Sequence, residues 1–253
     1  MFIKSPQSKI NINLKGAIQI NHNSYLVYTD VNGQTFLQNT KEDKLYKKVL
    51  QSMISANPKI KIILNKFNIK PSINIKALQE LTKGHMNETC RIAEGIYSIL
   101  SPHLQQEVNR SILKEASMLH DLGKVLIPSK ILNKPAKLNI REREIMSIHS
   151  VLGYELLKTQ SISKDTLGLI KYHHQNWKHS GYPDLEKDEN LSDIGVQLIS
   201  VADKYSALRE ARVYRNKMSR LEALLVLYKE VREGKILPEI YNALLIYAKK
   251  YDN

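Results

Sequence analysis

The stretch SILKEASMLHDLGKVLIP, residues 111–128, is the part of the sequence that decides the fold. Its apolar residues recur three and four positions apart up to Leu119, which predicts a helix with one buried face. His120 and Asp121 follow where this helix should end, and Gly123 then turns the backbone. Adjacent residues on a helix project about 100 degrees apart. The two side chains can therefore reach one shared point only near the helix end. Otherwise they would bind two metal ions at once.

Further histidines stand at helical positions elsewhere in the chain. A single histidine on an apolar helix face is more often a hydrogen-bonded core residue than a ligand. A paired imidazole before an irregular loop, or a carboxylate after an apolar run, is harder to explain by packing, because a buried unpaired charge is costly. Taken together, the candidates use five of the eight histidines: His85, His120, Asp121, His149, His173, His174 and Asp203.

This set of donors favours a centre of two metal ions. Imidazole and carboxylate without thiolate suit iron, manganese or zinc, and the single cysteine argues against a structural zinc site. Seven ligands exceed what one ion with an open substrate position can use. Two ions that share Asp121 and a water would accommodate them, and paired metals indicate hydrolysis of a phosphoester.

The N-terminal part of the chain differs in pattern from the rest. Alternation in SYLVYTDVNGQTFLQ, residues 24–38, predicts a hairpin that turns at Asn32-Gly33. A helical spacing follows in residues 41–56, and the run after Pro58 is ambiguous. We therefore predict a small α+β extension here, either as an accessory domain or as a packing extension over one end of the main fold.

Beyond Pro71 the pattern is helical almost throughout, with breaks at glycine and proline. The C-terminal part predicts two packing helices separated at Gly234 and Pro238. The sequence thus predicts a mainly α protein with an accessory domain at 1–70 and a helical domain at 71–253.

Composition restricts the partners and the compartment. The net charge of +13 would suggest a polyanionic partner, but residues 1–70 hold 11 basic against 3 acidic residues and residues 71–253 hold 27 against 22. The excess charge is thus concentrated in residues 1–70. No sequence-reading motif and no basic stretch interleaved with aromatic residues is recognisable, which argues against a nucleic-acid binder. No apolar stretch is long enough to span a membrane, and no signal peptide is recognisable. Together with a single cysteine, Cys90, this predicts a cytoplasmic protein.

Over about residues 75–250 the chain resembles the HD-GYP family of phosphodiesterases, a branch of the HD phosphohydrolase superfamily. The resemblance implies an HD-type helical bundle, a metal centre, and hydrolysis of the bacterial second messenger cyclic di-GMP to pGpG or GMP. It rests on several blocks in the right order: His85, HDLGKVLIP at 120–128, KPAKL at 134–138, His149, HHQNWKHSGYP at 173–183, VADKYSAL at 201–208 and RVYR at 212–215.

The resemblance also implies roles for individual residues. It makes the seven residues above metal ligands, with Asp121 as the bridge between two ions, iron or manganese. Lys124 would contact the scissile phosphate or assist departure of the leaving group. The loop Gly181-Tyr182-Pro183 would shape the pocket wall, and Arg212 and Arg215 would hold the second phosphate or a guanine edge.

The chain departs from the family pattern in two blocks. Gln175, Lys178 and His179 stand where the family has glutamate and an Asp-Gly pair, and Ser206 and Val213 replace an aspartate and a proline. The first change can reshape the loop, and the second removes a carboxylate near the expected guanine site. Trinuclear members have a glutamate four residues before His85, where this chain has Leu81 beside Glu80, which favours two metals over three.

Three other functions remain open at this point. The metal chemistry could serve another nucleotide or cyclic dinucleotide. The domain could be a non-catalytic receptor for the messenger. A protein partner could bind through residues 1–70, which match no sensory module.

Overall fold

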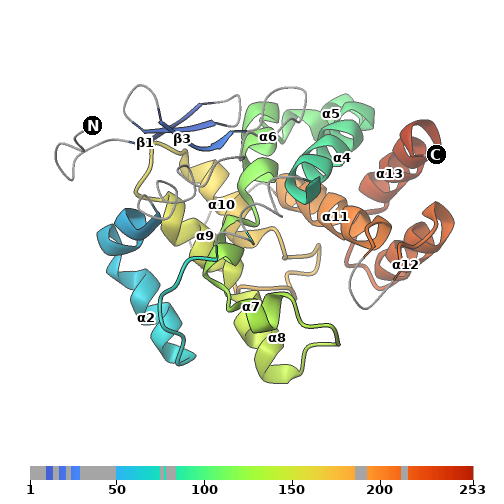
Figure 1. Ribbon diagram of the computed structural model, residues 1–253. Helices are drawn as coiled ribbons and strands as arrows, with labels where there is room; N and C mark the ends of the chain where they lie inside the picture. The colour runs from blue at the N-terminus through green and yellow to red at the C-terminus, as the bar shows by residue number, and fades with distance from the viewer. Residues whose placement is uncertain are drawn as a thin grey trace.

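The computed structural model shows a mainly helical chain with a small antiparallel sheet near the N-terminus (Figure 1). The mainly α fold predicted from the sequence is confirmed. The structure describes residues 10–13, 17–20, 24–28, 50–74, 77, 84–185, 193–211 and 216–252.

The sheet has the order β1-β2-β3, with each strand antiparallel to the next. Its last strand lies where the sequence predicts the first strand of a hairpin, whereas the other two were not predicted. The predicted turn at Asn32-Gly33 lies outside the described residues. The strands are β1 (Ile10–Asn13), β2 (Ala17–Ile20) and β3 (Ser24–Tyr28).

The helices begin and end mostly at capping residues and prolines. Asn109, for example, accepts hydrogen bonds from the backbone of Ser111 and Ile112 and so starts α6. The helices are α2 (Pro58–Lys66), α4 (Met86–Ile99), α5 (Pro102–Gln106), α6 (Arg110–Leu119), the short 3-10 helix η2 (Leu122–Leu126), α7 (Ser129–Leu132), α8 (Ile140–Ser147), α9 (His149–Leu157), α10 (Lys164–Tyr172), α11 (Asp193–Arg209), α12 (Arg220–Arg232) and α13 (Pro238–Tyr251).

The core forms where α4, α6, α9, α10 and α11 meet. Leu113 and Ala116 of α6 are fully buried, as the apolar stripe predicts. Among the described residues, a continuous cluster of buried apolar side chains joins these helices to α2, through Ile60 and Leu64, and to α13. Asn57, the N-cap of α2, also donates a hydrogen bond to Glu155 of α9. The division at residue 71 into two domains stays a prediction.

Gly123 explains how η2 and α9 come together. A Cβ atom at this position would lie 1.9 Å from the carbonyl oxygen of His149 and 2.5 Å from the backbone nitrogen of Gly153. Only glycine permits this close approach of two backbones. The contact places Asp121, two residues before Gly123, beside the first residue of α9.

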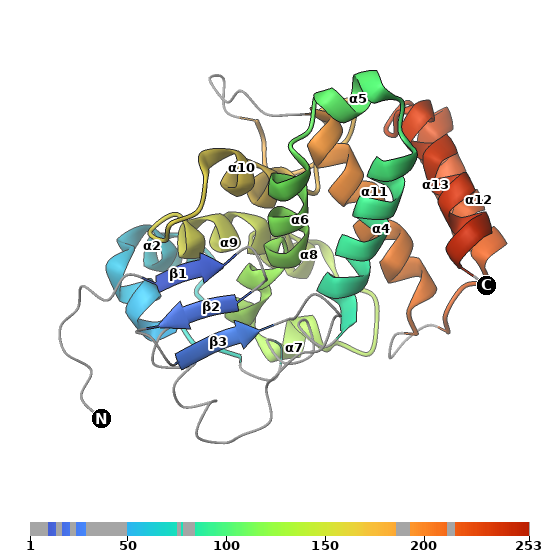
Figure 2. The ribbon, with the colours of Figure 1, turned by 90° about the horizontal axis from the view of Figure 1, so that it is seen from above.

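The C-terminal helices are separated as the sequence predicts: α12 ends at Arg232, Gly234 has a φ of +69°, and α13 begins at Pro238. Figures 1 and 2 show α12 and α13 at the opposite end of the molecule from the sheet. None of the helices in the described part of the chain is long and apolar enough to cross a membrane.

Candidate metal centre

His120 and Asp121 lie at the end of α6, and both are fully buried. The Nδ1 atom of His120 lies 2.8 Å from the carbonyl oxygen of Ser117. Because a carbonyl can only accept, Nδ1 carries a proton, and in the neutral ring Nε2 is the atom that presents a lone pair. Among the described residues, that Nε2 atom and Oδ1 of Asp121 have no hydrogen-bond partner although they are buried. Buried acceptors of this kind fit the coordination of a cation.

The same arrangement recurs at His149 and His173. Each Nδ1 atom donates to the carbonyl three residues earlier, at 2.7 Å, so each Nε2 atom again presents a lone pair. Burial, together with the neighbouring ring of His174, lowers the pKa of His173 well below its usual value, so that ring is neutral.

These lone pairs converge on one another. The Nε2 atom of His149 lies 3.2 Å from the Nε2 atoms of both His173 and His174. Between His149 and His173, whose Nδ1 atoms donate to backbone carbonyls, lone pairs facing each other at this distance repel, and a cation between them would remove the repulsion. Two nitrogens about 2.1 Å from one ion are roughly 3 Å apart when they subtend a right angle, so the spacing fits shared coordination.

The structure brings all seven predicted residues together in two sets that share Asp121. We call Asp121, His149, His173 and His174 the first group, and His85, His120, Asp121 and Asp203 the second group. Within each group, the potential ligand atoms lie within 4.8 Å of one another. Their role as ligands stays a prediction, but the donor set and the orphaned atoms fit a pair of divalent ions.

The first group has little charge apart from its shared carboxylate. Burial, together with the nearby ring of His149, lowers the pKa of His174 to about 3. Asp121 itself stays ionised: burial raises the pKa of its carboxyl, but Lys124, His120 and His149 outweigh burial and hold it well below the usual value.

The second group is held by ion pairs. The Nε2 atom of His85 lies 2.8 Å from Oδ1 of Asp203, and its Nδ1 atom lies 3.1 Å from Oε1 of Glu210. Burial lowers the pKa of His85, but the bonds to Asp203 and Glu210 outweigh burial and raise it to about 10. Burial raises the pKa of Asp203, and its contacts with His120 and His85 outweigh burial and lower it well below the usual value.

A family model described as HD domain matches residues 73–240, a span that includes all seven of these residues. The chain belongs to the HD domain family. Over 138 residues it is 36% identical to the cyclic di-GMP phosphodiesterase response regulator RpfG of Xanthomonas campestris. This match covers 53% of this chain and 35% of that protein. Over 115 residues it is 35% identical to the 3'3'-cGAMP-specific phosphodiesterase 2 of Vibrio cholerae. This match covers 44% of this chain and 21% of that protein. The chain thus matches about a third of the first relative and about a fifth of the second.

A solved structure of a HDG"Y"P protein, Bd1817 from Bdellovibrio bacteriovorus, has a similar fold. The TM-score is 0.51 at 14% identity, and the match covers 83% of this chain and 65% of that chain. This likeness supports the HD-type helical bundle that the sequence predicts.

Lys124 of this HD domain lies beside the shared carboxylate. Its Nζ atom is 2.5 Å from Oδ2 of Asp121, and its side chain is 18% exposed. The ammonium group therefore lies at the edge of the centre, between the buried carboxylate and solvent. Its predicted contact with a substrate phosphate stays a prediction.

The loop after α10 lies against the centre. The ring of Tyr182 lies 4.6 Å from that of His174, and a β-bridge joins the two residues. Gln175 holds the loop closed: its Nε2 donates to the carbonyl of Pro183, and its Oε1 accepts from the backbone nitrogen of Gly181. A carboxylate could only accept, so glutamine makes one bond here that an ionised glutamate could not.

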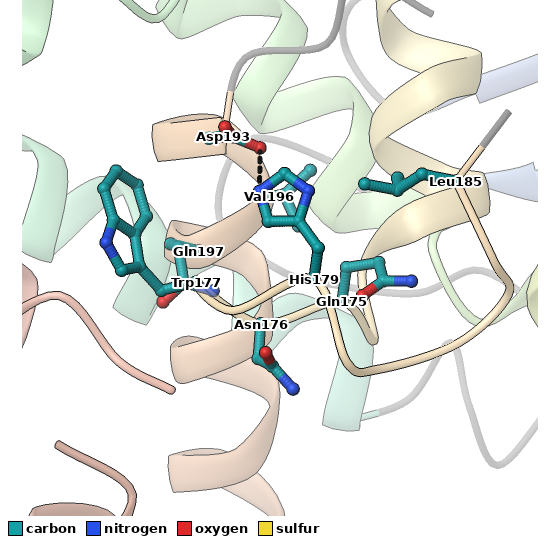
Figure 3. A pocket seen from close by; sticks show the side chains of 8 residues that line it. All are labelled: Gln175, Asn176, Trp177, His179, Leu185, Asp193, Val196 and Gln197. Atoms are coloured by element: carbon teal, nitrogen blue, oxygen red, sulfur yellow. Dashed lines mark ion pairs between the residues drawn. The ribbon is translucent and has the colours of Figure 1, made fainter. Parts of the chain in front are cut away.

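The two other substitutions in this loop are Lys178 and His179. His179 has a φ of +54°, a conformation that favours glycine, and its Nε2 atom lies 3.5 Å from Oδ1 of Asp193. Figure 3 shows this pair at a small pocket that Trp177 and Gln197 also line. None of the described residues that line this pocket belongs to either ligand group.

Two of the predicted substrate contacts, Arg212 and Arg215, lie outside the described residues. One residue that the sequence did not suggest does reach the centre, namely Glu210 at the end of α11. Its only signal in the sequence is that it stands one helical turn after Ser206, which replaces an aspartate of the family pattern.

Proposed function

We propose that this chain is a metal-dependent phosphodiesterase of the HD-GYP branch of the HD domain family, which hydrolyses cyclic di-GMP to linear pGpG or onward to GMP. The observation that carries the proposal is the position of Asp121, which belongs to both ligand groups. Similarity to a protein named as a cyclic di-GMP phosphodiesterase supports the substrate class.

The centre would hold two divalent ions, iron or manganese, one in each group. Such ions supply Lewis-acid charge for the phosphate oxygens and make a bound water acidic at neutral pH. The chain's own contribution is to hold the ligands in a buried pocket with their lone pairs already aimed, which lowers the cost of reorganisation during the reaction.

The remaining residues would bind and orient the nucleotide. Lys124 carries a positive charge at the rim of the centre and would contact the scissile phosphate or the leaving oxygen. Gly181, Tyr182 and Pro183 would form the wall beside the substrate. Arg212 and Arg215 would bind the second phosphate or a guanine edge.

The two parts of the chain would have different roles. Residues 71–253 would form the catalytic domain, and residues 1–70 would form an accessory domain or bind a protein partner. We place the reaction in the cytoplasm, as the sequence predicts.

A second candidate substrate is 3'3'-cGAMP. The observation in its favour is the 35% identity to a relative named as specific for that nucleotide. The two substrates share both phosphodiester linkages and differ in one base, so the metal centre would serve either.

The test is a hydrolysis assay on the purified chain, kept anaerobic and loaded with Fe²⁺ or Mn²⁺. Cyclic di-GMP, 3'3'-cGAMP and cyclic di-AMP are incubated separately, and products are separated by chromatography while bound metal is measured. We expect about two ions per chain and release of pGpG or GMP. Turnover of 3'3'-cGAMP alone would favour the second candidate. Metal-loaded protein that binds cyclic di-GMP without turnover would overturn the proposal in favour of a receptor.

A further inference from the structure

His85 is held differently from the other buried histidines of the centre. The rings of His120, His149 and His173 each donate Nδ1–H to a backbone carbonyl three residues earlier. The Nδ1 atom of His85 instead lies 3.1 Å from Oε1 of Glu210 and 3.2 Å from Oγ of Ser206. Both partners are side chains of another segment, more than a hundred residues away in the sequence.

Glu210 and Ser206 form a unit on one face of α11. The backbone nitrogen of Glu210 bonds to the carbonyl of Ser206 at 3.0 Å, so the helical turn continues to residue 210. The hydroxyl of Ser206 donates to Oε1 of Glu210 at 3.1 Å. The carboxylate oxygen therefore accepts from both the serine hydroxyl and the imidazole, and the serine fixes its direction.

This arrangement concerns the block VADKYSAL, residues 201–208, in which the chain departs from the family pattern. Ser206 stands where the resembling family has an aspartate, which suggests a lost carboxylate. Glu210 lies one turn further along the same helix and still reaches His85. A carboxylate is thus present at the Nδ1 side of this ring, supplied from a neighbouring position.

We infer that Glu210 is a positioning residue for the second group: with Ser206, it holds His85 in the tautomer that presents Nε2 to the metal. The inference rests on the proposed metal centre. Histidine ligands commonly donate their second N–H to a carboxylate or carbonyl, which fixes the ring and strengthens the metal bond. The side chain of Glu210 is 39% exposed, so it acts on the ring from the solvent side of the centre.

The test is titration calorimetry of the full-length, metal-free chain with Mn²⁺. The His85→Ala variant identifies the binding event of the second group by its loss. We expect Glu210→Ala to weaken that event by about 10- to 100-fold and to leave the first group's event within about threefold. Glu210→Gln keeps an acceptor for Nδ1–H and should lose less. Glu144→Ala, a matched change of an exposed carboxylate on α8, should have no effect.

Rescue separates positioning from a general structural defect. The double variant Ser206→Asp/Glu210→Ala returns a carboxylate to the neighbouring position and should recover Mn²⁺ affinity to within about threefold of wild type. Equal affinity of Glu210→Ala and wild type would overturn the role of Glu210 and leave the metal centre standing. Failure of the double variant to recover would also overturn it. Absence of Mn²⁺ binding to the wild-type chain would overturn the metal centre itself and the inference with it.

Discussion

The two ligand groups share Asp121 but are built in different ways. The first group takes its imidazoles from the start of α9 and the end of α10, and backbone carbonyls of the same segments fix the rings of His149 and His173. The second group collects side chains from α4, α6 and α11, and its ring of His85 is fixed by side chains alone. The first group is thus specified locally, whereas the second depends on how distant helices pack.

The two groups also differ in charge. Three imidazoles surround one carboxylate in the first group, and the pKa values of His173 and His174 are lowered by burial. Two carboxylates face two imidazoles in the second group, where ion pairs raise the pKa of His85. The rings of His173 and His174 in the first group are thus neutral, whereas His85 in the second group is protonated and paired with Asp203 and Glu210.

The largest expected effect comes from the residue that joins the groups. Asp121→Asn removes the charge and one of the two oxygens that can accept a ligand bond, so both groups lose their shared member. We expect turnover to fall on the order of 10³-fold, which corresponds to about 4 kcal/mol of transition-state stabilisation. The measurement is kcat on cyclic di-GMP, with bound metal determined in parallel. An unfolding curve like that of wild type would exclude a folding defect, and near-normal turnover would contradict the shared-carboxylate mechanism.

The next effect concerns the contact that brings the groups together. Gly123→Ala would force a methyl group against the carbonyl of His149 and the backbone of Gly153. Since backbone cannot rotate away as a side chain can, we expect a loss of about 3 kcal/mol in the free energy of unfolding, measured in urea. Gly84→Ala is the matched control, because a Cβ atom there meets nothing within 4 Å. Equal stability of the two variants would show that η2 can shift without cost.

The local parts of this centre could be predicted from the sequence. The position of His120 and Asp121 at a helix end and the apolar stripe that carries His149 follow from helical periodicity alone. The sequence predicts that Gly123 turns the backbone, but not that this turn packs against the backbone of α9. The same reasoning missed the break between α8 and α9, since the apolar pattern continues through Ile148.

The tertiary parts could not be predicted in this way. The contact between His85 and Glu210 joins residues 125 positions apart and depends on the packing of α4 against α11. The strands β1 and β2 have four residues each, too few for alternation to stand out from chance. Sequence periodicity identifies which face of an element is buried, but it does not say which element covers it.

The difference in charge predicts a difference in pH dependence. Because the pKa of His85 is raised to about 10 without metal, the ring is protonated at neutral pH, and an ion must displace the Nε2 proton. Affinity of the second group should therefore rise with pH, roughly tenfold per unit between about pH 6 and 9. The neutral rings of His173 and His174 have no proton to lose in this range, so the first group should respond less.

The measurement is calorimetric titration with Mn²⁺ in two buffers of different ionisation enthalpy. We expect release of about one proton on binding to the second group. The two binding events serve as each other's control. Equal proton release in both binding events would contradict the proposed difference between a neutral first group and an ion-paired second group.

The smallest expected effect lies at the C-terminal end of α11, the helix on which the second group depends. Arg209 pairs with Asp252 through two bonds, at 2.8 and 2.7 Å, and Tyr205 also donates to this carboxylate. Asp252→Asn should lower the free energy of unfolding at pH 7 by about 1 kcal/mol, as expected for a partly buried bidentate pair. Glu233→Gln, which breaks an exposed ion pair with Lys235, is the control and should change little.

The pH dependence of this last effect has a definite sign. Burial raises the pKa of Asp252, but Arg209 and Tyr205 outweigh burial and lower it below its unfolded value of 3.8. The pair therefore stabilises the fold fully above that value, and the stabilisation is lost as pH falls through the folded pKa. The difference between Asp252→Asn and wild type should shrink as unfolding is measured from pH 7 down toward pH 3. If the Arg209–Asp252 pair also holds α11 against α4, Asp252→Asn should weaken Mn²⁺ binding by the second group. Binding by the first group, whose histidines lie on other elements, should be unchanged. Equal weakening of both would show that the two groups depend on the packing of α11 alike.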